Sequence, residues 1–439
     1  MSVNDPLLKD LKGSVLGLIE NINGNCFILD SNVGLIEFCI LIEKVFSYGL
    51  NAQGNFVFTR QTEAWSWLES SVNNDNDIAS FKYSSAVKFV KQEECLSTNK
   101  GRLRALIRYC LNDGCLYVPV KHFVRDSKSK AIIYKQNSIL GDEILSEIFL
   151  SVLLQVSKIK FKLDASNTSF LDYTWDLPEV LKLELVPCKS LGISVSFVQE
   201  KALIVHIQSS SVLAENANVC VGDVLDSLNG VHICSSVKGK LNSIVRNSRG
   251  QPVLVKIVKV RNSKTNDLFS PIVALMKQLK LDPGISFNSS QDKGSGRKNK
   301  NSSTGFSAKY VGSSYIGMLG NTRQIDIAYK NLLSPFRQSE TDKERKIVKK
   351  FVNIEIGELG VKVYDCETSQ VILQHSFMEI SACGSVTLMP NYFAYIVGDG
   401  YCDVATDFTC HIFYSKDIDL VFTLLQSIGQ GFRRTHYAV

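Results

Sequence analysis

The N-terminal third of the chain carries apolar residues at helical spacing. Within residues 35–46 apolar side chains return every three or four positions, and Gly49 follows the run as a helix-ending residue. Similar runs cover residues 103–111 and 144–156, whereas the alternation typical of strands is scarce between residues 8 and 163. The pattern predicts an all-helical N-terminal domain.

Shorter apolar runs with partial alternation begin near residue 181. They cover residues 193–197, 203–207 and 253–260, and a short helix fits residues 236–246. This second pattern predicts a small β-domain with helices.

Residues 283–304 are dominated by Ser, Asn, Gly and Lys, which predicts a flexible linker that is basic at its end. No aromatic residues lie among its charges, so the composition favours a solvated linker over a nucleic-acid-binding segment.

Composition narrows the class of protein. The chain has 439 residues, of which 45% are hydrophobic and 21% are charged, and its net charge is +6. These values are typical of several globular domains. The twelve cysteines are scattered without paired C-x-x-C spacing, so we expect reduced thiols, no metal site and a cytoplasmic protein. We see no secretory signal and no apolar stretch near the roughly 18 residues of a membrane span.

Motifs of common enzymes are absent. The sequence contains no G-x-x-x-x-G-K-[ST], G-x-S-x-G or H-E-x-x-H pattern, so we expect neither an enzyme nor a cofactor. His206, His232 and His411 lie in segments with strand character, where we expect core or surface histidines.

The C-terminal region contains five segments in a characteristic order. They are residues 306–313, 380–384, 392–396, 408–413 and a helical run over 417–434. In this order they resemble a phosphotyrosine-binding (PTB) domain over residues 305–439. The resemblance implies a PH-like β-sandwich capped by a helix, which binds peptides and catalyses no reaction.

In PTB domains a peptide, often containing Asn-Pro-x-Tyr, pairs with the fifth strand and packs on the last helix. The resemblance implies that this strand covers residues 380–386 and that Phe422, Leu425 and Ile428 form the apolar face of the helix, with Phe422 in the core. The implied peptide groove comprises Ile380, Ser381, Ala382, Cys383, Gly384 and Phe432. Because residues 380–386 contain no Arg, we expect binding that does not require phosphate.

A basic cluster precedes the predicted strand over residues 351–356. It comprises Lys343, Arg345, Lys346, Lys349 and Lys350. Some PTB domains use such a face for phosphoinositide headgroups at a membrane surface. A solvated loop is the alternative interpretation.

The helical region resembles RUN domains. The matching segments are Leu41-Ile42-Glu43 before Gly49, Trp65-Ser66-Trp67-Leu68, the run from Asn99 to Arg108, and Leu140-Gly141-Asp142-Glu143. RUN domains are all-helical, and several bind small GTPases of the Rab, Rap or Arf-like groups, or motor proteins on vesicles.

Within that region Lys100, Arg104 and Arg108 are spaced four apart, so on a helix they form one basic stripe. We interpret the stripe as a docking face for an acidic partner such as a GTPase. A solvated helix face or internal ion pairs are the alternatives.

The middle region resembles PDZ domains in two segments. Lys189-Ser190-Leu191-Gly192-Ile193 resembles the loop that binds a peptide's terminal carboxylate, and residues 221–230 match the family's core segment. A glycine there lets backbone N–H groups converge on the carboxylate. The strand edge over residues 193–197 would accept the peptide as an added strand, and Lys189 would add charge.

The predicted groove helix departs from the family pattern. With Arg246 at the helix end, Lys238 takes the first groove position, where many PDZ domains carry His. Lysine cannot accept a hydrogen bond, so we expect an acidic or large polarisable ligand side chain. A shift of one residue would place Val237 there and select an apolar side chain. A PDZ fold with a silent groove is the further alternative.

The chain ends in a sequence that has the form of a PDZ ligand. Tyr437, Ala438 and Val439 place a free carboxylate on an apolar residue, with an aromatic residue two positions before it. The tail would recruit a PDZ protein or this chain's own PDZ domain. A frayed terminus is the alternative.

Together these features predict a multidomain α+β protein. Its expected parts are a RUN domain over residues 1–165, a connector over 166–180, a PDZ β-barrel with helices over 181–262, a linker over 263–304 and a PTB domain over 305–439. We expect a cytoplasmic adaptor, at times peripheral to membranes or vesicles, that links C-terminal and Asn-Pro-x-Tyr peptides to a small GTPase or motor, with no nucleic-acid partner. The alternative is a small-GTPase effector regulating an enzyme or a trafficking step, in which the PDZ and PTB domains are structural.

Overall fold

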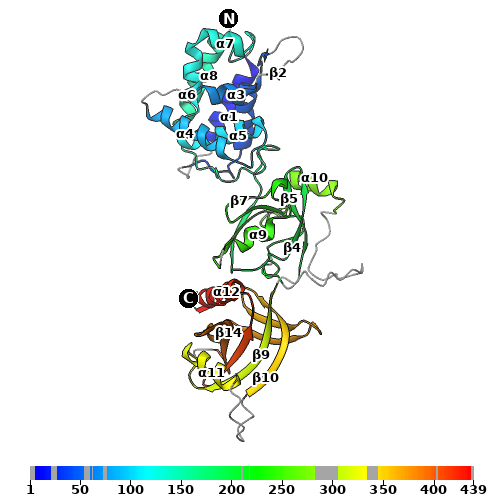
Figure 1. Ribbon diagram of the computed structural model, residues 1–439. Helices are drawn as coiled ribbons and strands as arrows, with labels where there is room; N and C mark the ends of the chain where they lie inside the picture. The colour runs from blue at the N-terminus through cyan, green and yellow to red at the C-terminus, as the bar shows by residue number, and fades with distance from the viewer. Residues whose placement is uncertain are drawn as a thin grey trace. The chain divides into compact units, whose positions relative to one another are not determined.

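A computed structural model describes most of the chain (Figure 1). The described residues are 5–20, 27–53, 60–61, 63–72, 77–208, 211–216, 218–248, 250–281, 305–333, 345–401 and 404–436. They form two compact units, Met1–Pro178 and Glu179–Val439. Residues 283–304 of the predicted linker lie outside the described residues.

The N-terminal unit is helical, as predicted. Its helices are α1 (Pro6–Glu20), α2 (Leu35–Ser47), α3 (Ala64–Ser70), α4 (Ile78–Gln92), α5 (Asn99–Asp113), α6 (Tyr117–Arg125), α7 (Ser127–Ile133) and α8 (Glu143–Val156), and the two-residue strands β1 (Ala52–Gln53) and β2 (Arg60–Gln61) pair with each other. Polar side chains begin two of these helices. Thr98 caps α5 and Asp142 caps α8, each accepting hydrogen bonds from backbone N–H groups of the first turn.

Aromatic side chains fill the core of the N-terminal unit. Trp67 Nε1 donates a hydrogen bond to the Tyr134 hydroxyl (2.9 Å), which itself donates to the Phe46 carbonyl (2.5 Å). Phe46 and Phe149 meet edge to face, with ring centroids 5.7 Å apart. Because the buried polar atoms of Trp67 and Tyr134 are hydrogen-bonded to each other, these rings are buried without unpaired donors.

The second unit begins with a six-stranded sheet. Its strands are β3 (Val180–Leu185), β4 (Ile193–Val198), β5 (Lys201–Ile207), β6 (Val224–Leu228), β7 (Val231–His232) and β8 (Val253–Val258), in the order β3-β8-β6-β5-β4, with β7 paired to β6. The short helices are the 3-10 turn η1 (Ser235–Val237), α9 (Leu241–Arg246) and α10 (Ser270–Gln278). We call residues 179–281 the first lobe.

A seven-stranded antiparallel sheet follows, and residues 305–436 are called the second lobe. Its strands are β9 (Phe306–Gly317), β10 (Arg345–Ile356), β11 (Gly360–Asp365), β12 (Val371–Ser376), β13 (Ile380–Val386), β14 (Met389–Gly398) and β15 (Phe408–Tyr414), in the order β12-β11-β10-β9-β15-β14-β13. Helices α11 (Arg323–Leu333) and α12 (Ile418–His436) pack on this sheet (Figure 1). An antiparallel sheet closed by a C-terminal helix confirms the predicted fold of this region.

Helix α12 is amphipathic, which explains how it closes the sheet. Val421, Leu424 and Ile428 return every three or four residues and are buried. Farther along the same face, Gly431 lies against the Phe377 ring so closely that a Cβ atom would clash with it. Only glycine permits this close approach of the helix backbone to the ring.

Candidate peptide-binding surfaces

Strand β13 forms one edge of the second lobe's sheet. It pairs with β14, and helix α12 packs alongside it. Ile380 is buried, whereas Ser381, Ala382, Cys383 and Gly384 are half-buried. The structure thus brings the five residues predicted on the strand onto the edge beside α12.

Cys383 lies where this edge meets the helix. Its thiol donates a hydrogen bond to the Leu425 carbonyl of α12, with a sulfur–oxygen distance of 3.8 Å. Burial raises the pKa of Cys383 to about 11, so the thiol is neutral at physiological pH. The edge therefore presents small, uncharged side chains.

Helix α11 fixes the end of β13. The Asp326 carboxylate accepts hydrogen bonds from the Thr387 backbone N–H (2.9 Å) and hydroxyl (2.6 Å), and these bonds lower the pKa of Asp326. A Cβ atom on Gly384 would lie 3.3 Å from Ile325 of the same helix. These contacts position the strand's end, and no sequence motif pointed to α11 as part of this region.

Phe432 of α12 is half-buried. It lies seven residues after Leu425, so both project from the same side of the helix. Phe422, by contrast, was predicted in the core and is 51% exposed. The prediction for Phe422 was wrong because it lies on the outer side of the helix, where its ring meets Gly250 of the first lobe.

In the first lobe, β4 is the strand at one end of the sheet order and pairs with β5. Gly192 precedes it with a φ of +68°, a conformation that favours glycine. The Gly192 N–H donates to Ser190 Oγ (3.3 Å), and Leu191 is buried. Lys189 Nζ donates to the Gly305 carbonyl of the second lobe (3.3 Å), so this cation has a partner within the chain.

The predicted groove helix is shorter than expected. Lys238 ends the η1 turn with extended backbone dihedrals, and Gly239 follows with a φ of +79°. Helix α9 begins only at Leu241. Lys238 therefore does not occupy the first helical position, because the left-handed residue after it separates it from the helix.

Apolar side chains of β4 and of the segment around α9 nevertheless pack on the same buried cluster, which also contains residues of the second lobe. The half-buried residues that pack on one shared core are Ile193, Val195 and Phe197 of β4 together with Val237, Leu241 and Ile244. The edge of β4 and these side chains are the described features on which the PDZ resemblance depends, and the groove itself stays a prediction.

The predicted basic stripe of the N-terminal unit is not one exposed face. Arg104 is 5% exposed and Arg108 is 3% exposed. Arg104 Nε donates to Glu43 Oε2 (2.9 Å), and Arg108 Nη2 donates to Asp30 Oδ1 (2.6 Å). The interpretation of the stripe as a docking face is therefore wrong for Arg104 and Arg108. Their charges face the interior and form ion pairs, which was one of the alternative interpretations. Lys100 alone has an exposed side chain, at 60%.

The basic cluster is only partly described. Lys343 lies outside the described residues, and the side chains of Arg345 and Lys346 are not described. Lys349 is exposed at an irregularity in the β9–β10 pairing, with a φ of +49°. Lys350 Nζ pairs with the Asp365 carboxylate (2.8 Å), which raises the pKa of the lysine.

His411 and His375 lie among tyrosines inside the second lobe. His411 Nδ1 is 3.0 Å from the Tyr310 hydroxyl, and His375 Nδ1 is 3.2 Å from the Tyr395 hydroxyl. Burial lowers the pKa of His411 to about 3. His411 is thus a neutral core histidine, as predicted.

Tyr437, Ala438 and Val439 lie outside the described residues, so the tail remains a prediction. Among the residues that are described, no group of three His, Cys, Asp or Glu side chains has the arrangement of a metal site. Within the same part of the chain, no helix is long and apolar enough to cross a membrane.

Two family models match the chain. A model of the RUN domain matches residues 37–167, and a model of the phosphotyrosine interaction domain (PTB/PID) matches residues 306–438. They confirm the RUN and PTB resemblances, and both are interaction domains rather than catalytic ones. No PDZ domain is found, so the PDZ resemblance of the first lobe stays a prediction. No curated protein matches the chain.

Proposed function

We propose that this chain is an adaptor whose central activity is the capture of peptides by the second lobe. The observation that carries the proposal is the edge of β13 beside α12, within the region that matches the PTB/PID family. An extended peptide adds to this edge as a further strand, so that backbone hydrogen bonds supply affinity and side-chain contacts with α12 supply selectivity.

The chemistry of the groove supports a ligand without phosphate. Strand β13 contributes small neutral side chains, including the Cys383 thiol. Arg434 of α12 already bonds to Glu184 and Glu358, so its charge is neutralised within the chain. An Asn-Pro-x-Tyr peptide fits this surface, with Phe432 packing against its turn.

The N-terminal unit supplies a second binding function. RUN domains commonly bind small GTPases, and a GTPase of the Rab, Rap or Arf-like groups is the proposed partner. Because Arg104 and Arg108 are buried, the docking surface is formed by other residues, with exposed Lys100 as the remaining member of the predicted stripe. Two linked sites raise the effective concentration of each partner for the other, which is the physical basis of an adaptor.

The first lobe is proposed to bind C-terminal peptides at β4, with the Lys189–Ile193 loop contacting the terminal carboxylate. Two observations favour the alternative in which this lobe is structural. Lys189 is bonded to Gly305, and Lys238 lies before the helix rather than on it. Titration with C-terminal peptides, free and amidated, separates the two roles, because only a PDZ-like groove discriminates between them.

A peptide titration tests the central proposal. The full-length chain is titrated with a labelled Asn-Pro-x-Tyr peptide, and Phe432→Ala is expected to weaken binding about 5- to 150-fold, the range for an interface residue that contributes 1–3 kcal/mol. Phosphorylating the tyrosine is expected to change affinity little.

The matched control is Phe351→Ala on β10, which removes the same ring from a position that is 68% exposed. It is expected to bind like the unaltered chain. Equal losses in both variants, or no binding at about millimolar peptide, would refute the proposal.

A further inference from the structure

The outer side of α12 faces the first lobe. Phe422, Gln426, Gln430 and Arg434 follow one another at intervals of four, so they form a single stripe. A Cβ atom on Gly250 of the first lobe would lie 3.1 Å from Gln426 Cγ and 3.2 Å from Phe422 Cε1. Gln430 Nε2 donates to the Gly250 carbonyl (3.0 Å). Helix α12 thus contacts the second lobe's sheet on one side and the first lobe on another.

Arg434 joins two carboxylates from different lobes. Its Nη1 donates to the Glu184 carbonyl and to Glu358 Oε2, both at 2.9 Å, and its Nη2 lies 3.2 Å from Glu184 Oε1. Glu184 belongs to β3 of the first lobe, and Glu358 lies between β10 and β11 of the second. A planar guanidinium suits this arrangement, because its donors are held in a fixed fork.

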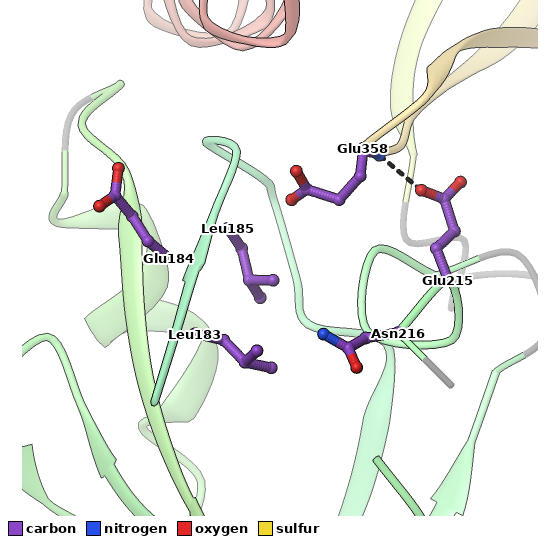
Figure 2. A pocket seen from close by; sticks show the side chains of 6 residues that line it. All are labelled: Leu183, Glu184, Leu185, Glu215, Asn216 and Glu358. Atoms are coloured by element: carbon purple, nitrogen blue, oxygen red, sulfur yellow. Dashed lines mark hydrogen bonds between the residues drawn. The ribbon is translucent and has the colours of Figure 1, made fainter. Parts of the chain in front are cut away.

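Glu358 also holds the backbone that follows β3. Its Oε1 accepts a hydrogen bond from the Val186 N–H (3.1 Å), and its own N–H donates to the Glu215 carboxylate. Figure 2 shows Glu358 and Glu215 joined in this way beside a cavity of about 390 Å³, which Leu183, Glu184, Leu185 and Asn216 also line.

The backbone at Val186, which Glu358 holds by a hydrogen bond, leads directly into the Lys189–Ile193 loop. Val186 is bonded three residues before the loop, and Lys189 at its start is bonded to Gly305 of the second lobe. A loop that binds a carboxylate through converging N–H groups requires a fixed backbone. The contacts that fix its entry come from the second lobe.

We propose that Arg434 and Glu358 are positioning residues for the Lys189–Ile193 loop, and that α12 couples this loop to the peptide groove at β13. The inference rests on the proposed function of the second lobe. A peptide that packs on α12 reduces the motion of Arg434 and thereby orders residues 184–192. Coupling of this kind is reciprocal, so a ligand at the loop would strengthen peptide binding at β13 by the same factor.

Hydrogen exchange of the full-length chain, without any ligand, tests the positioning. In Arg434→Ala the amides of residues 184–192 are expected to exchange about tenfold faster, which corresponds to about 1.4 kcal/mol. The control is Arg433→Ala, which removes an equal charge from an exposed neighbouring position and should exchange like the unaltered chain. Unchanged exchange in Arg434→Ala would overturn the proposal.

A second pair of variants keeps the test decisive if Arg434→Ala unfolds. Gly250→Asn places a side chain against Phe422 and Gln426, whereas Gly230→Asn meets nothing within 4 Å. The φ angles are +76° and +79°, and Asn tolerates this region, so backbone strain is matched. Faster exchange over residues 184–192 in Gly250→Asn alone supports coupling through α12, and equal exchange in both variants contradicts it.

Adding the Asn-Pro-x-Tyr peptide tests the coupling itself. Saturating peptide is expected to slow exchange over residues 184–192 about threefold or more in the unaltered chain and to leave it unchanged in Arg434→Ala. Peptide that binds without slowing this exchange would overturn the coupling. If the chain binds no peptide, the proposed function is refuted and the coupling with it. The hydrogen exchange of the variants without ligand still tests whether Arg434 positions the Lys189–Ile193 loop.

Discussion

Arg104→Ala is expected to destabilise the N-terminal unit strongly. The Arg104 guanidinium is bonded to both oxygens of Glu43, at 2.9 and 3.3 Å, and to the Leu171 carbonyl at 3.0 Å. It lies 5.6 Å from the centre of the Trp175 ring, whose Nε1 donates to the same carboxylate. Removing the arginine leaves Glu43 buried without its main cationic partner.

The size of the expected destabilisation follows from the burial of the Arg104–Glu43 ion pair. Breaking a buried ion pair by removing one partner costs about 3–5 kcal/mol, and in a unit of this size each kcal/mol lowers the melting temperature by about 2–4 °C. The expected shift is therefore about 6–20 °C. Lys100→Ala is the matched control, because Lys100 is 3.7 Å from the same Glu43 carboxylate but its side chain is 60% exposed. An exposed pair contributes about 0–1 kcal/mol.

Tryptophan fluorescence gives a selective assay in the full-length chain. The three tryptophans, Trp65, Trp67 and Trp175, all lie in the N-terminal unit and are buried, so their emission follows the unfolding of this unit alone. Replacing Glu43 and Arg104 together with Met should cost less than the sum of the two single replacements. If Arg104→Ala melts within about 2 °C of Lys100→Ala, the structural role assigned to Arg104 is wrong.

Two further predictions concern the second lobe. The pKa of His411 is lowered from 6.5 to about 3, so between these pH values the unfolded chain binds more protons than the folded chain. The free energy of unfolding therefore has its full value above pH 6.5 and decreases as the pH falls toward 3, by about 2 kcal/mol at pH 5. Thermal melts followed by tyrosine circular dichroism should show this slope, and His411→Gln should flatten it; an equal slope in both would contradict the assignment. In α12, Gly431→Ala should destabilise by about 1–3 kcal/mol, because its Cβ meets the Phe377 ring. Gly429→Ala, with open space at Cβ, should be neutral or stabilising by up to about 1 kcal/mol, and equal melting of the two variants would refute the contact.

The helices and strands that could be predicted from the sequence are those whose residues follow a recognisable local pattern. Helices α2, α5 and α8 have apolar residues at helical spacing, and capping residues begin α5 and α8. Strand β4 begins at the first residue of its short apolar run, and β13 covers the residues that the PTB resemblance implied. The order of such segments was sufficient for the RUN and PTB resemblances.

The remaining features depend on contacts between distant residues. Spacing placed Arg104 and Arg108 on one face of a helix but could not tell whether that face meets solvent or Glu43, which lies 61 residues away. Likewise, Lys238 lies outside helix α9 because Gly239 adopts a left-handed conformation, which a glycine in the sequence permits but does not require.

Glu358 and Arg434 were missed for the same reason, since each acts on a partner in another lobe. The four-residue spacing from Phe422 to Arg434, on the side of α12 away from its apolar face, was the one local signal available.

The proposed function requires that a peptide bind at β13 rather than elsewhere on the second lobe's sheet. The sheet order has two ends, β13 and β12, and β12 provides an internal control. Hydrogen exchange of the full-length chain with and without an Asn-Pro-x-Tyr peptide compares them directly. We predict slower exchange of amides in residues 380–386 and no change in residues 371–376. Protection of β12, or binding that protects neither strand, would contradict this prediction.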